Sequence, residues 1–467
     1  MPLGPTFGRM TTDLRRLLWV FPIFALLLCS CDVHKKLGEM HYKEGAKKFA
    51  NSNYVEAVKD FSAALAQNAD YTDAYLNRGV AELVLSNYTA AIKDFDQVTR
   101  LDPGKTMAYT WRGYILYVQQ DYGAALTNLS AAIKLEPDDT VALKYRGIIR
   151  AQVHDLDGAL ADLNQAEQAD AFDSEIFRAR AGLQFLRTEY ESTISDASKA
   201  IELDAKDANA YRFRGLARMR LKDSIGALAD LDAAIALNSR DSEAYAARGS
   251  INVSAGDYKA ALTDLARATQ LNPTNPAAMG GLAFVKKKTG DLPGALEVLT
   301  AVVPLAPKNP LLFQSLGYVQ SDLTQYEPAL KSLRRAIELD PKMYYPRYRI
   351  WLIRSRLGET AAATTELKAD LATREDDGEH PWEQCISRFL TGDLEETNLI
   401  AQAEETAKRP TDVSEHQCEA YYYAGMKRLL AGDKPGAAEL FEKSLATKED
   451  NYAEYYSAQV ELRELNK

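Results

Sequence analysis

A ladder of residues spaced by thirty-four positions constrains the fold of this chain more than any other feature. It runs without insertion or deletion through ten rungs: Gly45, Gly79, Gly113, Gly147, Ala181, Gly215, Gly249, Ala283, Gly317 and Trp351. Twelve residues after each rung comes a second, mostly small position: Ala57, Ala91, Ala125, Ala159, Thr193, Ala227, Ala261, Ala295, Ala329 and Ala363. Two small positions per repeat predict a close crossing of two helices, because short side chains let helix backbones approach.

Each repeat is predicted to form two amphipathic helices, A and B. Apolar residues recur at helical spacing on both sides of a short polar turn, such as those around Asn87 and Asp257. A large apolar residue at position 24 is expected to fill the space between layers: Phe61, Phe95, Leu129, Leu163, Leu231, Leu265, Leu299 and Leu333. Proline at position 32 is expected to end helix B because it has no N–H, and it occurs as Pro103, Pro137, Pro273, Pro307 and Pro341.

This pattern resembles the tetratricopeptide repeat family, whose 34-residue unit carries Gly or Ala at positions 8 and 20, an aromatic residue at 24 and proline at 32. Ten in-register units follow from the ladder: 38–71, 72–105, 106–139, 140–173, 174–207, 208–241, 242–275, 276–309, 310–343 and 344–377. The resemblance implies an all-α fold, a right-handed α-solenoid of helix–turn–helix repeats. Its core would lie between neighbouring repeats rather than in one compact centre.

The C-terminal part, residues 378–467, is expected to hold degenerate repeats that bring the total to eleven or twelve hairpins. An eleventh repeat is predicted at 378–411, and six extra residues then shift the phase before a last clear repeat at 418–451. Residues 452–465 are predicted to form a capping helix, since a solenoid must cover its last apolar face.

Residues 1–30 are predicted to be a signal peptide. Three arginines precede an apolar run at 17–28, which is too short to span a bilayer. The sequence Leu28-Cys29-Ser30-Cys31 resembles the bacterial lipobox, which implies that Cys31 is lipidated and that residues 31–37 form a tether. The alternatives are an ordinary cleaved signal and an uncleaved anchor. A lipid anchor would place the protein in the bacterial cell envelope, facing the periplasm, on either the inner or the outer membrane.

Two cysteines, Cys385 and Cys418, would remain as thiols after lipidation. In an oxidising periplasm a disulfide between them is the default expectation. The alternative is a metal site with His380 and His416, but the spacing matches no known zinc signature. No metal and no cofactor is therefore predicted.

Two columns of charge run through the same repeats. Position 7 carries Arg78, Arg112, Arg146, Arg180, Arg214 and Arg248, and position 23 carries Asp60, Asp94, Asn128, Asp162, Asp196, Asp230 and Asp264. The arginines could bind a polyanion, but both columns end together, at Leu282 with Val298 and at Leu316 with Ser332. Paired scaffolding is therefore preferred, and the net charge of −10 also disfavours nucleic acid. Pairing within or between repeats is left open.

The resemblance implies that positions 2, 5, 9 and 12 of the A helices line a concave groove. Position 5 carries Lys144, Arg178 and Arg212, with no acidic partner apparent at a fixed offset. Aromatic residues flank this stripe: Tyr114, Tyr117, Phe185, Phe284 and Tyr318. Cations among flat rings suit an acidic or C-terminal peptide. The alternative is that the cations are simply solvated and the rings only fill space.

No catalytic motif is recognisable, so an enzyme is not expected. The order of residues around Tyr345-Pro346, Pro381-Trp382 and Tyr421 to Gly425 is similar to the C-terminal part of NlpI-type lipoproteins, which implies an envelope scaffold. The predicted function is a non-enzymatic adaptor that binds protein partners in the groove. The alternative is a structural component of an envelope complex that uses its convex face or its ends.

Overall fold

The computed structural model describes residues 33–372, 380–450 and 452–466, and across these ranges the chain forms helices and no strand. The chain divides into two compact units, Met1–Lys222 and Asp223–Lys467, which we call the N-terminal and C-terminal units. The predicted signal peptide and Cys31 lie outside the described residues. None of the described helices combines the length and apolar character needed to cross a bilayer.

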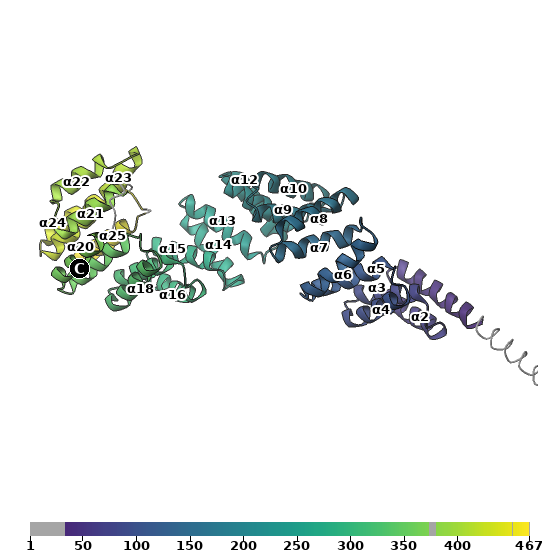
Figure 1. Ribbon diagram of the computed structural model, residues 1–467. Coiled ribbons are helices and arrows are strands. Elements are labelled where there is room, and N and C mark those ends of the chain that lie inside the picture. Colours follow the sequence, from purple (N-terminus) through teal and green to yellow (C-terminus); the bar gives the residue numbers. More distant parts are fainter. Residues whose placement is uncertain (1–32, 373–379, 451, 467) are drawn as a thin grey trace, which may run out of the picture. The chain divides into compact units, whose positions relative to one another are not determined.

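The N-terminal unit consists of successive antiparallel helical hairpins (Figure 1). A helix over residues 33–50 comes first. It is followed by α2 (Tyr54–Gln67), α3 (Thr72–Val84), α4 (Tyr88–Leu101), α5 (Thr106–Val118), α6 (Tyr122–Leu135), α7 (Thr140–Gln152), α8 (Leu156–Ala169), α9 (Ser174–Leu186), α10 (Tyr190–Leu203) and α11 (Ala208–Arg220).

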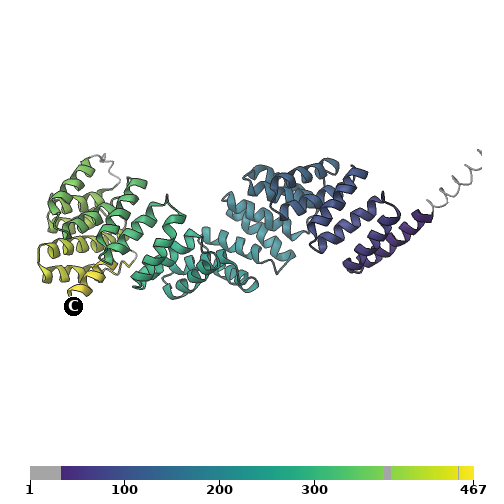
Figure 2. The ribbon, with the colours of Figure 1, turned by 90° about the horizontal axis from the view of Figure 1, so that it is seen from below.

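The C-terminal unit continues the hairpin pattern and ends in a group of tightly packed helices, drawn in green to yellow in Figure 2. It contains α12 (Ser224–Leu237), α13 (Ser242–Ser254), α14 (Tyr258–Leu271), α15 (Pro276–Lys288), α16 (Leu292–Val302), η1 (Val303–Leu305), α17 (Pro310–Asp322), α18 (Tyr326–Leu339), α19 (Tyr345–Arg356) and α20 (Thr360–Ala372). The last helices are α21 (Pro381–Thr391), α22 (Glu396–Glu405), α23 (Pro410–Leu430), α24 (Lys434–Ala446) and α25 (Ala453–Leu465).

The small-residue ladder lies where each A helix crosses its own B helix. A Cβ added to Gly79 would lie 2.7 Å from the Phe95 ring, and one added to Gly113 would lie 2.7 Å from Leu129. The alanines at position 20 are buried in the same crossings, for example Ala91 and Ala125 at 0% exposure. Positions 8, 20 and 24 therefore form one close contact in each repeat, and the predicted all-α solenoid of hairpins is confirmed.

The turn between helices A and B requires a left-handed residue at position 15. Gly256 adopts φ 76° there, whereas Gln120 and His154 adopt φ 63° and 65° at the equivalent places. Because an L-residue with a Cβ rarely adopts this conformation, the turn is strained wherever glycine is absent.

The C-terminal end departs from the regular pattern in two places. The six extra residues lie within α23, which begins at Pro410 and so extends the last A helix at its N-terminal end. At the tenth rung Trp351 is buried, and it packs in one cluster with Leu367, Trp382, Phe389 and other residues of α19 to α24. The degenerate repeats thus form a continuous aromatic core rather than separate layers.

Candidate binding surface on the A helices

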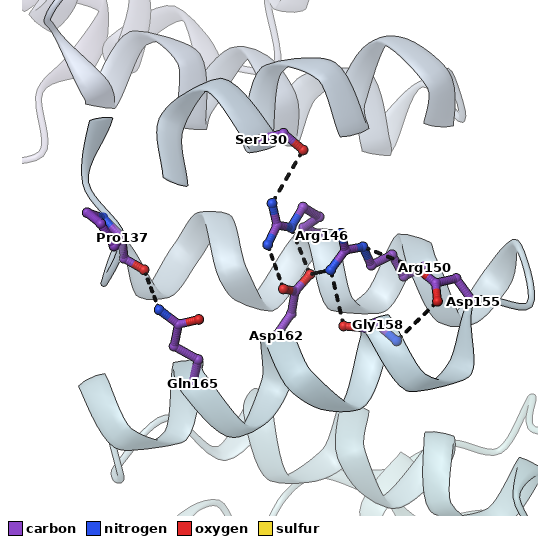
Figure 3. A network of polar contacts seen from close by, with 8 residues as sticks. All are labelled: Ser130, Pro137, Arg146, Arg150, Asp155, Gly158, Asp162 and Gln165. Carbon is purple, nitrogen blue, oxygen red and sulfur yellow. Dashed lines mark hydrogen bonds and ion pairs between the residues drawn. The ribbon is translucent and has the colours of Figure 1, made fainter. Parts of the chain in front are cut away.

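The arginine column is paired within repeats. Arg78 donates from Nε and Nη2 to the two carboxylate oxygens of Asp94 at 2.8 and 2.7 Å. Arg146 makes the same bidentate contact with Asp162, at 2.8 and 2.6 Å (Figure 3). Further such pairs are Arg180 with Asp196 and Arg248 with Asp264, while Arg112 donates to Asn128. This geometry answers the question left open by the sequence, because each of these pairs joins helix A to helix B of one repeat.

Each of these arginines also reaches back to helix B of the preceding repeat. Figure 3 shows Arg146 between Asp162 and Ser130 of that earlier helix. Arg112 contacts Asp96, Arg214 contacts Ser198, and Arg248 contacts Asp232 in the same way. In the sixth repeat, Arg214 belongs to the N-terminal unit, whereas the position-23 residue Asp230 belongs to the C-terminal unit. The column therefore links successive B helices, and its guanidinium groups are occupied by scaffold contacts rather than directed at a polyanion.

The position-5 stripe has acidic partners that the sequence analysis missed. Lys144 Nζ lies 2.6 Å from Asp173 and 2.9 Å from Glu175, and its side chain is only 8% exposed. Arg178 lies 3.4 Å from Asp207 and 2.9 Å from Glu175. The shared offset is twenty-nine residues, from position 5 to the aspartate that caps the next A helix. The expectation of cations without a fixed partner was therefore wrong.

Charge pairing holds these groups ionised. Burial lowers the pKa of Lys144, but the hydrogen bonds that it donates to Asp173 and Glu175, together with their negative charges, outweigh burial, so the pKa is raised overall. For Glu175, burial raises the pKa, but the hydrogen bonds and charges of Lys144 and Arg178 together outweigh burial, so the pKa is lowered overall. Arg212 donates to Asn209 and lies over the Phe213 ring, 4.9 Å from its centroid. Lys144 and Arg178 therefore join neighbouring repeats and are not part of an open basic stripe.

The predicted aromatic residues of the N-terminal unit lie along the A helices and contact one another. Tyr114 and Tyr117 both pack on Tyr145, with ring centroids 4.8 and 5.4 Å apart. Phe185 packs on Tyr190 at 5.8 Å. All of these rings remain partly exposed. The structure thus brings Tyr114 and Tyr117 together and leaves Phe185 two repeats further along.

Apolar residues that the sequence analysis overlooked lie beside these rings at position 13 of α3, α5 and α9, whereas α7 carries Gln152 at this position. Val84, Val118 and Leu186 are 51%, 38% and 61% exposed. They lie at the ends of α3, α5 and α9, adjacent to the position-12 residues Leu83, Tyr117 and Phe185. We call positions 9, 12 and 13 of the A helices the groove face. These apolar side chains could have been recognised in the sequence as surface candidates, because position 13 is not one of the positions 8, 20 and 24 that form the hairpin crossing.

In the C-terminal unit the groove face is covered by the chain's own last helix, α25. Tyr318, predicted to line an open groove, is 3% exposed and shares a cluster with Ile350 that contacts Ala453. Lys288 lies over the Tyr456 ring at 4.3 Å and over Phe284 at 5.0 Å. Phe284 itself stays 37% exposed. The capping helix therefore forms as predicted, and it also contacts repeats far from the end of the chain.

A buried polar network fastens α25 in place. Arg349 pairs with Asp322 at 3.0 Å and donates to Ser457 at 2.6 Å. Ser457 in turn donates to Asp322 at 3.2 Å. Tyr423 donates to Glu454 at 2.9 Å, and Arg356 pairs with Glu461. These contacts join residues that are 108 and 135 positions apart, so no local sequence pattern predicts them.

Near this network, Glu419 is buried among aromatic donors. Its Oε2 accepts from Trp382 Nε1 at 2.5 Å and from Tyr345 at 3.2 Å. Burial raises the pKa of Glu419 well above its usual range, and nearby Glu454 raises it further. The carboxyl group is therefore favoured in its protonated form.

The predicted disulfide is not formed. Cys385 and Cys418 are both free, buried thiols. Cys385 on α21 contacts Gln402 of α22, whereas Cys418 on α23 contacts Ser444 of α24. Each thiol thus faces the B helix of its own hairpin, so the two point into successive layers. Burial raises the pKa of Cys385, and it raises that of Cys418 to about 11.

The two histidines considered for a metal site have other roles. His416 stacks on Trp382 with ring centroids 4.4 Å apart, and burial lowers its pKa. His380 lies 3.6 Å from Glu383 and packs on Tyr344. Within the described ranges no group of His, Cys, Asp and Glu side chains could hold a metal ion.

Comparisons with known proteins agree with the repeat pattern. Tetratricopeptide repeat models match residues 42–106, 111–174 and 214–276, residues 252–316, and residues 312–343. Similar solved structures include a tetratricopeptide repeat protein from Parabacteroides merdae, 15% identical, with a TM-score of 0.41 over 54% of this chain and 99% of that one. The pilF protein of Pseudomonas aeruginosa is 15% identical, with a TM-score of 0.42 over 46% and 97%. YrrB, described as a TPR protein with an unusual peptide-binding site, is 24% identical, with a TM-score of 0.35 over 40% and 96%.

Proposed function

Because the chain belongs to the tetratricopeptide repeat family, whose fold supports protein-interaction scaffolds, we propose that it is an adaptor of the bacterial cell envelope. Its groove face in the N-terminal unit binds protein partners, and a lipid on Cys31 holds it at a membrane. Proteins of this family are generally scaffolds without catalytic activity, and we extend that role to this chain.

One observation supports the choice of surface. Val84, Val118 and Leu186 expose large apolar side chains in one register, next to the rings of Tyr117 and Phe185. The hairpin core does not use these side chains, and position 13 of α15, α17 and α19 in the C-terminal unit contacts α25 instead. Exposed large apolar side chains that gather on neighbouring helices, as Val84 and Val118 do on α3 and α5, mark interaction sites. The partner is therefore expected to offer apolar side chains rather than the acidic peptide favoured by the sequence analysis.

The binding surface is tested by crosslinking in the native envelope, using the full chain and a Val84→Glu variant. A buried carboxylate in the interface should reduce partner capture at least tenfold. Val55→Glu is the matched control, because Val55 has the same side chain and similar exposure (54%) but lies on the B helix α2. Equal capture by both variants would contradict the assignment of the groove face.

The anchor is tested separately. A Cys31→Ala chain, exported by a secretory signal that is cleaved normally, should move from the membrane fraction to the soluble fraction. Several acyl chains give stable anchoring because each buried CH₂ contributes about 0.8 kcal/mol. Continued membrane association of the Cys31→Ala chain would disprove the lipid anchor, and separating inner from outer membranes would locate the wild-type protein.

A second candidate function is assembly into a larger complex through other surfaces. Phe172, between α8 and α9, and Ile225, in the first turn of α12, are 82% and 86% exposed. Partner capture that is lost in Phe172→Glu or Ile225→Glu, but retained in Val84→Glu, would favour this alternative.

A further inference from the structure

The C-terminal unit shows what kind of element its groove face accepts, because α25 contacts position 13 of three successive repeats. Lys288 of α15 lies over Tyr456, Asp322 of α17 accepts from Ser457, and Arg356 of α19 pairs with Glu461. Tyr318, at position 9 of α17, belongs to the cluster that contacts Ala453. A single helix therefore meets three A helices through Tyr456, Ser457 and Glu461, which lie within two turns of α25.

The two sides of this contact match in chemistry. The groove face of α15, α17 and α19 carries charge at position 13, and α25 presents Ser457 and Glu461 to it. Burial of these polar groups is compensated by hydrogen bonds and ion pairs, as it must be in a desolvated contact. The lining of the groove face thus determines which side of a helix can lie on it.

On three A helices of the N-terminal unit, α3, α5 and α9, position 13 is apolar, whereas it is Gln152 on α7 and Arg220 on α11. Val80, Leu83 and Val84 form one apolar triad on α3, and Tyr114, Tyr117 and Val118 form another on α5. On α9 the triad is Gly182, Phe185 and Leu186. Residues at i, i+3 and i+4 lie on one face of a helix, so α3 and α5 each offer a short apolar ridge, whereas Gly182 adds no side chain to the ridge on α9.

We propose that the partner element bound by the N-terminal unit is an amphipathic α-helix with an apolar stripe at i, i+3, i+4 and i+7. Such a helix packs its ridges between those of the neighbouring A helices α3 and α5, whereas a charged helix like α25 would leave its ions unpaired there. The inference rests on the proposed function, since it names the class of partner that the same surface takes.

The test begins with the full chain carrying p-benzoylphenylalanine in place of Val118 or Leu186, photolysed in the native envelope. Mass spectrometry identifies the crosslinked segment of the partner, which is then synthesised in two forms. One form has α-aminoisobutyrate, a helix-stabilising residue, at two uncrosslinked positions, and the other has proline at one of them. Their affinities for the purified chain lacking its signal peptide are measured by fluorescence anisotropy.

We expect proline to weaken binding at least tenfold and α-aminoisobutyrate to preserve or strengthen it, because proline disrupts a helix interior. Both effects should vanish in the Val84→Glu chain and persist in Val55→Glu. Equal binding of the two peptides, still dependent on Val84, would overturn the helical partner and leave the adaptor function intact. Binding that is insensitive to Val84→Glu, or no crosslink at either position, would overturn both.

Discussion

At the scale of single residues, the position-7 arginines illustrate how a charge column becomes scaffolding. The Arg78 guanidinium satisfies Asp94, whose side chain is only 6% exposed, and also contacts Ser62 of the preceding repeat. Removing one member leaves a buried charge without a partner, whereas removing both removes the need for pairing. In a later repeat both charged residues are replaced by apolar ones, with Leu282 at position 7 and Val298 at position 23.

Arg78→Leu alone is therefore expected to lower the free energy of unfolding by about 3 kcal/mol, because Asp94 would stay buried and unpaired. The double variant Arg78→Leu with Asp94→Val should recover most of this loss. Urea unfolding, with amide hydrogen exchange in α3 and α4, measures both effects. Additive losses in the double variant would show that the pair is not coupled.

The burial of Lys288 predicts that the stability of the folded protein rises with pH over a defined range. Burial lowers its pKa to about 8, with Asp450 opposing and Lys287 adding to that change. Folding therefore favours the neutral amine, so the cost of burying the charge is present below pH 8 and is relieved as pH rises toward 10.5. Wild type should gain stability relative to Lys288→Met across this window. A constant difference in melting temperature between pH 7 and 10.5 would contradict the shift.

At the scale of elements, the crossing of helices A and B is set by paired sizes at positions 8 and 24. Gly113 faces Leu129, whereas Ala181 faces the smaller Ala197 in another repeat. Helices that pack this closely accommodate a larger residue at position 8 only when the residue at position 24 is smaller.

Gly113→Ala should destabilise the protein by about 1–3 kcal/mol, because its Cβ would lie 2.7 Å from Leu129. Leu129→Ala also destabilises on its own by leaving a cavity. The two changes together should cost less than their sum, which a double-mutant cycle of urea midpoints reveals. Full additivity would mean that α5 and α6 relax independently.

At the scale of the whole molecule, a prediction concerns the two thiols. Since Cys385 and Cys418 are free and buried in separate hairpins, reducing agent should leave the melting temperature of the mature chain unchanged. Ellman titration should find two thiols that react only after denaturation. A fall in melting temperature on reduction, or fewer than two thiols in the denatured chain, would show that the disulfide forms after all.

Much of the fold was predictable from the chain alone, because the thirty-four-residue pattern acts locally. It predicts where each A helix begins, as at Thr72, Thr106 and Thr140, and which residues meet in each crossing. The arginine column was recognised as paired for the same reason. Only part of the candidate surface was recognised: Tyr114, Tyr117 and Phe185 lie on the groove face, but Val84, Val118 and Leu186 were overlooked and Lys144 is buried in ion pairs.

The identity and spacing of the hairpins are thus specified by the chain alone, since each hairpin depends on contacts within about thirty-four residues. Tertiary structure decided which A-helix faces remain open. Within the C-terminal unit α25 contacts Lys288, Asp322 and Arg356, from repeats more than a hundred residues earlier. Small rotations between successive repeats add up along a solenoid, so a contact across many repeats depends on all of them and is not written in any single one.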